Sequence, residues 1–322
     1  MTRARPVWQD ASSHSDSDSE SEVKNVGYSR SKGYWQYTGE TFARWFCRCC
    51  GRRQGPSQLS FLPTLMCLAL CLCLPAGEGY ELRSALLSSG RTISYAYRPS
   101  PLAEADARTV LMIHPVGVGI AGWFYNNMMR DDVLPSCNLL VPDLWGCGKS
   151  ALLDPAKEGI SLPTDWVRDC EAVCGDVQGG LVVVAQGGIA PVGLQLAQRG
   201  NVPVKSLILT SPPVYDDLVK PIGSGEFGRN LQALQFFKGV VRILLCRRSA
   251  IEFFSNLFLF AGEADDSFLS LATKDAQSRS EQIEPVLIFN AGGLTTRSWA
   301  EEIAGLGGAL RVVSGAEESG AR

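Results

Sequence analysis

The sequence predicts an α/β fold: a mostly parallel central sheet with helices on both faces and a short helical cap. From about residue 80 onward, short apolar runs alternate with longer mixed segments. Continuous apolar runs of this length are typical of strands buried on both faces, as in parallel sheets. Their alternation with helix-like segments indicates repeated β-α-β units. The predicted strands are residues 91–97, 110–113, 139–141, 181–184, 206–209, 286–289 and 310–313.

Two helices are predicted between these strands. One covers residues 164–176, where Pro163 precedes the helix and Thr164 is a candidate N-cap. The other covers residues 192–199 and directly follows a predicted strand. Each helix would connect two neighbouring parallel strands and cover one face of the sheet.

A short helical cap is predicted at about residues 216–282. Strand signals are weak across this interval, while residues 230–245 and 251–260 are apolar and helix-like. In open α/β sheets, ligands bind outside the carboxyl ends of the strands. We therefore expect the cap to cover that edge of the sheet.

The N-terminal part of the chain is predicted to lie outside this domain, which spans residues 80–322. Residues 1–60 form a tail rich in Ser, Asp and Glu and later in basic residues, a composition typical of disorder. Residues 61–77 form a hydrophobic targeting or anchor segment. Its apolar part, residues 61–76, is shorter than the roughly 20 residues of a spanning helix and suits a signal-like h-region or a membrane attachment.

Composition excludes several classes of function. The net charge of −3 gives no electrostatic basis for binding nucleic acid. The eleven cysteines lack the regular spacing of a disulfide framework, so we expect reduced thiols. No set of metal ligands is evident in the sequence, and we expect neither a metal nor another cofactor.

The loop after the strand 110–113 is a candidate binding loop. It begins with His114 and contains Gly117-x-Gly119-x-x-Gly122, a pattern typical of dinucleotide binding, with Asp143 about 20 residues further on as the acidic partner. In a hydrolase the same loop donates a backbone N–H to an oxyanion hole. On that interpretation Val116 or Gly117 is the donor, and His114 lines the pocket.

The next loop, residues 143–150, reads DLWGCGKS. It lacks the first glycine of a phosphate-binding loop. We expect a structural role instead, because Asp and Ser side chains bond loop backbone and glycines accept turn conformations. The residues assigned this role are Asp143, Gly146, Gly148 and Ser150.

The third loop has the strand–turn–helix form of a nucleophile elbow, whose motif is G-x-S-x-G. Aligning Gly188 with the last glycine of the motif puts Gln186 at the nucleophile, followed by Gly187. A glutamine amide is a poor nucleophile. It can still donate and accept hydrogen bonds at the base of a pocket.

The acid and base positions of a catalytic triad also lack suitable residues. After the predicted strand 286–289, the acid position falls near Gly292, and after the last strand the base position falls near Glu318. The chain has two histidines, of which His14 lies in the predicted tail. His114 is therefore the one histidine in the predicted domain, and it lies far from the usual C-terminal place of the base.

These loops together resemble the α/β-hydrolase superfamily over about residues 80–318. The resemblance rests on residues 114–119 (HPVGVG), 142–150 (PDLWGCGKS) and 184–188 (VAQGG). Within the superfamily the chain is similar to a subgroup from cyanobacteria, algae and plants that tends to carry Gln at the elbow. This resemblance implies a plastid location, with a membrane-anchored or secretory route as the alternative.

Three functions are compatible with these residues. The first is a non-hydrolytic protein with a degenerate triad that binds a small apolar ligand or a protein partner. The second is an active ester hydrolase, related hydrolase or lyase that uses unconventional groups such as His114 or Cys147. The third is a dinucleotide-binding protein that uses Gly117, Gly119 and Gly122.

Overall fold

The computed structural model describes residues 79–102, 107–117, 119–154, 159–175, 177, 179–212, 221–258 and 263–313. The tail and hydrophobic segment predicted at residues 1–60 and 61–77, and Glu318, lie outside these residues. All described residues belong to one compact unit. No helix among them is long and apolar enough to cross a bilayer.

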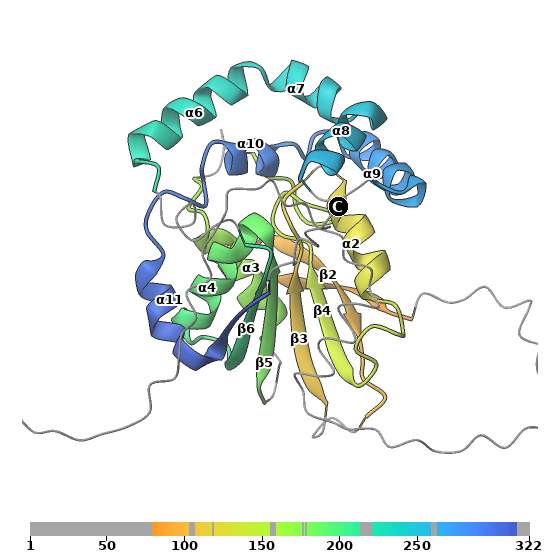
Figure 1. The fold of residues 1–322 in the computed structure, drawn as a ribbon, viewed down its shortest axis with the longest axis vertical. Helices are drawn as coiled ribbons and strands as arrows, with labels where there is room; N and C mark the ends of the chain where they lie inside the picture. The colour runs from red at the N-terminus through yellow and green to blue at the C-terminus, as the bar shows by residue number, and fades with distance from the viewer. Residues whose placement is uncertain are drawn as a thin grey trace, which may run out of the picture. The chain divides into compact units, whose positions relative to one another are not determined.

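The described residues form a seven-stranded sheet in the order β1-β2-β4-β3-β5-β6-β7 (Figure 1). β1 and β2 pair antiparallel at one edge, β2 pairs antiparallel with β4, and every pair from β4 to β7 is parallel. The predicted mostly parallel sheet is thus confirmed. The strands are β1 (Glu81–Leu86), β2 (Thr92–Arg98), β3 (Arg108–Ile113), β4 (Cys137–Pro142), β5 (Leu181–Gln186), β6 (Val204–Thr210) and β7 (Leu310–Val313).

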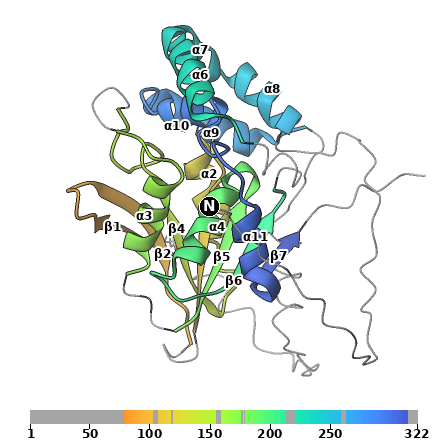
Figure 2. The ribbon, with the colours of Figure 1, turned by 90° about the vertical axis from the view of Figure 1, so that its left-hand side faces the viewer.

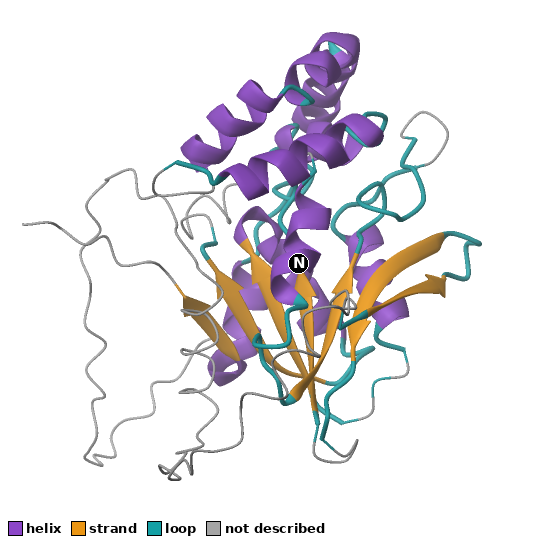
Figure 3. Cartoon of the chain, turned by 90° about the vertical axis from the view of Figure 1, so that its right-hand side faces the viewer, coloured by secondary structure: helices purple, strands orange, loops and turns teal. Residues whose placement is uncertain are grey.

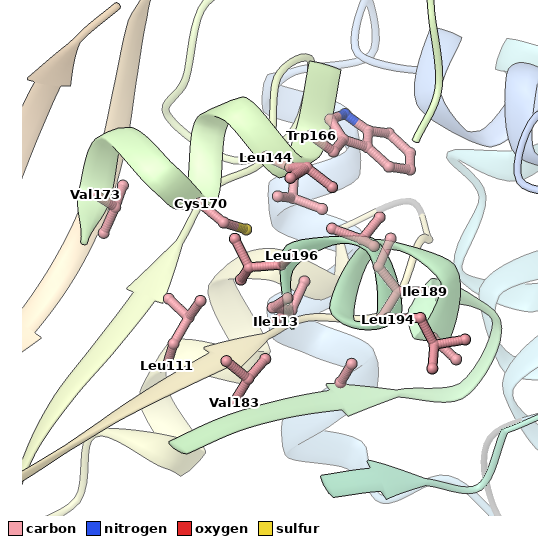
Figure 4. Packing of buried hydrophobic residues seen from close by; sticks show 14 of the residues in the cluster. Leu111, Ile113, Leu144, Trp166, Cys170, Val173, Val183, Ile189, Leu194 and Leu196 are labelled. Atoms are coloured by element: carbon pink, nitrogen blue, oxygen red, sulfur yellow. The ribbon is translucent and has the colours of Figure 1, made fainter. Parts of the chain in front are cut away.

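Helices cover both faces of this sheet. α3 (Thr164–Val173), α4 (Ala190–Arg199) and α11 (Ala300–Leu306) pack together on one face, and α2 (Ile120–Met128) lies on the other (Figures 1 and 2). The core around the sheet is correspondingly divided into two buried clusters, one on each face, and a third cluster lies within the cap on α8 and α9. Figure 4 shows part of the first cluster, in which Cys170 of α3 lies beside Leu196 of α4.

The long connection between β6 and β7 is helical. It contains α6 (Ser224–Phe236), α7 (Lys238–Leu245), α8 (Arg248–Phe258), α9 (Asp266–Ser278) and α10 (Glu284–Asn290), followed by α11. The interval 216–282, expected as a cap, thus holds α6 to α9. These helices lie beyond the carboxyl ends of the parallel strands, with α6 and α7 outermost (Figures 1 and 3).

The prediction of a strand at residues 286–289 is wrong, because this segment belongs to the helix α10. Pro285 lies at the start of the helix, where its missing N–H costs nothing, whereas the same proline would remove a hydrogen bond from a sheet. A short apolar run cannot be assigned to strand or helix by its periodicity alone. The edge strand β1 was not predicted, since four of its six side chains are polar or small.

The helix α3 begins at the expected residue but is shorter than expected, ending at Val173. Pro163 occupies the N-cap position and makes no side-chain capping bond. Thr164 is therefore the first helical residue rather than the cap.

Candidate functional site

The turn between β5 and α4 has the predicted strand–turn–helix form, and its residue of positive φ comes one position after Gln186. Gln186 ends β5 in an extended conformation, with φ −104° and ψ 126°. Gly187 follows with φ +66° and starts the turn into the helix. In a nucleophile elbow the reactive residue occupies this strained turn. In this turn the residue with positive φ is therefore Gly187, which has no side chain.

Helix α10 covers this elbow from the cap side. A Cβ atom on Gly188 would lie 2.4 Å from Cζ of Phe289, so the aromatic ring packs directly on the glycine backbone. A Cβ on Gly187 would meet only the carbonyl oxygen of Ser211, at 3.9 Å. The requirement for glycine thus differs at the two positions: close packing at Gly188, and a positive φ at Gly187.

We expect Gly187→Ala to lower the free energy of unfolding by about 1–2 kcal/mol, because alanine is strained in the left-handed region although space is available. Gln186→Ala should change it by less than about 0.5 kcal/mol, since Gln186 is extended and half-buried. Urea unfolding of both variants checks this difference. Equal losses would contradict the placement of the turn at Gly187.

Gly292 does not lie after a strand, since the preceding segment is α10. Its φ of +93° belongs to the turn that ends this helix, and a Cβ there would lie 2.1 Å from Cδ1 of Ile222. The basis for assigning Gly292 to the acid position therefore fails. The described strand that follows β6 in the sheet is β7.

His114 is buried and fully hydrogen-bonded. Its Nδ1–H donates to the carbonyl oxygen of Pro115 at 2.8 Å, and its Nε2 accepts from the backbone N–H of Leu144 at 3.4 Å. The ring also lies edge-on to Phe124. Burial lowers the pKa of His114 to about 4, so the imidazole is neutral near pH 7. Both ring nitrogens are occupied, which leaves no lone pair for a general base.

The loop 143–150 is held by its own side chains. Oδ2 of Asp143 accepts from the backbone N–H of Lys149 at 2.7 Å, and Oγ of Ser150 donates to the Asp143 carbonyl oxygen at 2.5 Å. A Cβ on Gly148 would lie 1.9 Å from Oδ1 of Asp143, so this position admits only glycine. Gly146 has a φ of +84°. These contacts explain the composition of the loop without a nucleotide.

The glycine pattern at 117–122 also has a packing explanation. β3, which precedes it, is the third strand of the chain and lies in the middle of the sheet. A Cβ on Gly119 would lie 2.1 Å from the carbonyl oxygen of Ala272 on α9, and Gly122 lies within α2. The cap backbone thus occupies the space beside Gly119 that a pyrophosphate would need. Asp143, fully buried, is not free to bind a ribose.

A small cavity lies between the cap and the loops after β3 and β4. It has about 20 Å³ of space for water-sized molecules, room for about one water. Its polar lining comes largely from the cap, through Asp275 and Arg279 of the α9 region and Gln282. The remaining lining residues are Gly117, Gly119, Ala121, Cys147, Gly148, Ala276, Pro285 and Val286. Sequence reasoning did not find the cap residues, because they lie more than 120 positions from these loops.

Two carboxyl groups near this cavity have raised pKa values. Burial raises the pKa of Asp143 to about 7, and the nearby Asp275 carboxylate adds to the effect. Burial also raises the pKa of Asp275. Oδ1 of Asp143 finds no hydrogen-bond partner within the described part of the chain. A proton on Asp143 thus relieves the cost of a buried charge.

The described cysteines do not provide a reactive thiolate or a metal site. Burial raises the pKa of the Cys147 thiol strongly, which disfavours the reactive thiolate. The described cysteines form no disulfide with one another: Cys137, Cys147, Cys170, Cys174 and Cys246. No group of three or more His, Cys, Asp or Glu side chains among the described residues could hold a metal ion.

Ser211, which directly follows β6, is a polar side chain near the elbow that the sequence pattern did not indicate. It has φ +51°, an uncommon conformation for a serine, and its carbonyl oxygen faces Gly187. Its buried hydroxyl has no hydrogen-bond partner in the described structure. The Ser-Pro sequence at residues 211–212 is the only sequence signal that could have drawn attention to this turn.

Comparisons with solved structures support the fold. The chain is similar to a mutant haloalkane dehalogenase DatA from Agrobacterium tumefaciens C58, with a TM-score of 0.51 and 17% identity over 74% of this chain and 80% of that one. It is also similar to a probable hydrolytic enzyme from Pseudomonas aeruginosa PAO1, with a TM-score of 0.51 and 16% identity over 76% and 89% of the two chains. The chain has the α/β-hydrolase fold.

Sequence comparisons add nothing to this result: no family model and no curated protein matches the chain. At identities below 20%, the two structures show a shared fold and not a shared activity.

Proposed function

We propose that this protein is a non-hydrolytic member of the α/β-hydrolase fold. The observation that carries the proposal is the absence of a side chain at the elbow, where Gly187 occupies the strained turn. Catalysis by this fold needs a nucleophile at that turn and a base within hydrogen-bond reach. His114 supports the proposal further, because both of its ring nitrogens are already bonded.

The proposed activity is binding, and a protein partner suits it better than a small apolar ligand. Ligand pockets typically enclose several hundred cubic ångströms. The cavity beneath the cap has room for about one water, and Phe289 packs against the elbow. A drug-sized ligand at this place would require α10 and the cap to move apart.

The alternative is an active hydrolase or lyase that uses unconventional groups. One observation favours it, namely the strained Ser211 beside the elbow with an unpartnered hydroxyl. A serine nucleophile needs a neighbouring base to remove its proton. The described hydrogen bonds assign no such base to Ser211, so this alternative has the weaker support.

Ester hydrolysis by the purified full chain tests the proposal. A panel of short and long acyl esters is compared for the wild type, Gly187→Ala, Gln186→Ala and His114→Gln. We expect all four proteins to hydrolyse the esters at the rate of the buffer alone. Turnover by the folded wild type that Gly187→Ala or His114→Gln reduces tenfold or more would contradict the proposal.

We further propose a plastid location and membership of the photosynthetic subgroup. The support is the resemblance of the three loops together with the apolar segment at residues 61–76, preceded by basic residues. A fluorescent fusion at the C-terminus of the full chain, expressed in an algal cell, tests the location. Fluorescence confined to the plastid is expected, and fluorescence along the secretory route would contradict it.

A further inference from the structure

The outer helices of the cap expose an unusual amount of apolar surface. At the end of α6, at the residue that follows it and on α7, large apolar side chains are half or more exposed, and α8 adds Phe253 at 61%. Such side chains normally face a core, and a contiguous exposed patch marks an interaction site. The cap face, as we call it, consists of Phe236 (83%), Phe237 (56%), Val240 (67%), Ile243 (59%) and Leu244 (51%).

The orientation of α7 is fixed by polar contacts on its inner side. Nζ of Lys238 pairs with the carboxylate of Glu284 on α10, and Nε2 of Gln235 donates to the same carboxylate. Glu284 is buried, with 1% of its surface exposed. Helix α7 therefore directs a charged side chain inward and Val240, Ile243 and Leu244 outward. Val241 and Leu245, which are half-buried, lie on the inner side as well, so α7 presents apolar residues both toward the cap and toward the outside, whereas the outward face of an ordinary surface helix is polar.

The spacing on α7 is that of an amphipathic helix. Val240, Ile243 and Leu244 are related by i, i+3 and i+4, so they share one side of the helix. Figure 2 shows α6 and α7 at the outer limit of the cap, with α10 and α9 between them and the sheet. No described element covers the outward side of α7, so its apolar residues meet whatever lies outside the domain.

Unpaired cations are interleaved with these apolar residues. Arg242 and Arg247 are exposed and form no ion pair within the described part of the chain. From residue 236 to residue 254 the sequence carries four basic residues and one acidic residue. A helix with aromatic and aliphatic residues on one side and basic residues flanking them is typical of a membrane surface.

From these contacts we propose that the cap face docks on an anionic lipid bilayer. Its apolar side chains would enter the interface, and Arg242 and Arg247 would pair with lipid phosphates or carboxylates. A second copy of the chain is a poorer occupant, since symmetric pairing would bring like charges together. The proposal does not depend on whether the elbow is catalytic.

Vesicle co-sedimentation of the full chain tests this docking. Vesicles of phosphatidylcholine with 30% phosphatidylserine (about one charged lipid in three) are compared with phosphatidylcholine alone. The variants are Ile243→Asp with Leu244→Asp, Arg242→Glu with Arg247→Glu, and a control, Leu86→Asp, on the exposed edge strand β1 (72% exposed). Circular dichroism establishes that each variant is folded.

We expect the wild type and Leu86→Asp to bind anionic vesicles alike. Both double variants should bind these vesicles at least about tenfold more weakly than the wild type. The aspartate variant loses buried apolar surface, and the glutamate variant reverses two charges. Equal binding by all proteins would overturn the proposal and assign attachment to the segment 61–76. A second outcome would also overturn the proposal: the wild type is a dimer in sedimentation velocity, and Ile243→Asp with Leu244→Asp dissociates that dimer without changing vesicle binding.

Discussion

Replacing Arg91 with leucine is expected to lower the free energy of unfolding by about 3–5 kcal/mol at pH 8. Nη2 of Arg91 lies 2.9 Å from Oδ1 of Asp169, whose side chain is fully buried. The other carboxylate oxygen of Asp169 accepts from the backbone N–H of Trp145, and the guanidinium stacks 4.0 Å above the Trp145 ring. The variant would leave a buried carboxylate without its counterion.

The loss should become smaller at acidic pH. Burial already raises the pKa of Asp169 to about 6, although Arg91 opposes the shift. Without Arg91 the pKa rises further, so protonation removes the uncompensated charge at pH 5. Chemical denaturation of wild type and variant at pH 5 and pH 8 measures both values.

A matched control is the exposed pair formed by Arg130 and Asp132, whose side chains are each 55% exposed. Arg130→Leu should change the free energy of unfolding by about 1 kcal/mol or less, because solvent screens an exposed ion pair. A loss as large as that of Arg91→Leu would contradict the assignment of the effect to burial. A loss of less than about 1 kcal/mol for Arg91→Leu at pH 8 would contradict it equally.

The second large effect is the pH dependence of Asp143. Its pKa is about 7 in the folded protein, against an ordinary value of 3.8. The folded state therefore binds this proton more tightly than the unfolded state, and the group lowers stability as pH rises from 4 to 7. Relative to wild type, Asp143→Asn should become more stable over this interval by on the order of 4 kcal/mol.

The titration of His114 changes the stability of the protein with pH in the opposite direction. Its pKa is about 4 in the folded protein, against 6.5 ordinarily, so the unfolded state binds this proton more tightly. The group therefore raises stability as pH increases from 4 to 6.5. Relative to wild type, His114→Gln should lose on the order of 3 kcal/mol of stability over that interval.

Denaturation of both variants from pH 4 to pH 8 distinguishes the two groups, because each difference from wild type isolates one titration. If the difference in unfolding free energy between Asp143→Asn and wild type did not change with pH, the Asp143 carboxylate would stay charged in the folded protein. If the unfolding free energy of both variants changed with pH in the same direction relative to wild type, the assigned protonation states would be contradicted. Leu86→Asp, at the exposed edge strand, is again a suitable surface control.

The sequence predicted most of the central sheet, because strands buried on both faces are apolar throughout. β3 and β5, for example, have almost no exposed side chains. β1 was missed because its two faces are both largely exposed, so no apolar pattern marks it. The segment 284–290 was mistaken for a strand because buried helices and buried strands have similar composition when they are short.

The candidate site was less predictable than the fold. The motif at residues 184–188 fixed the place of the elbow, but either Gln186 or Gly187 could follow the strand, and only the backbone angles distinguish them. Phe289 and Asp275 reach the site from the cap, through tertiary packing that no local pattern encodes. Ser211 is likewise identified only by its conformation and its unpartnered hydroxyl.

The most direct test of the central claim is covalent trapping with a fluorophosphonate, which modifies activated serine nucleophiles. The full chain is incubated with the reagent, and intact and peptide mass spectrometry locate any adduct. Because Gly187 offers no nucleophile and His114 no free nitrogen, we expect no adduct on residues 79–313. A stoichiometric adduct in this region, above all on Ser211, that the folded His114→Gln variant fails to form would contradict the claim.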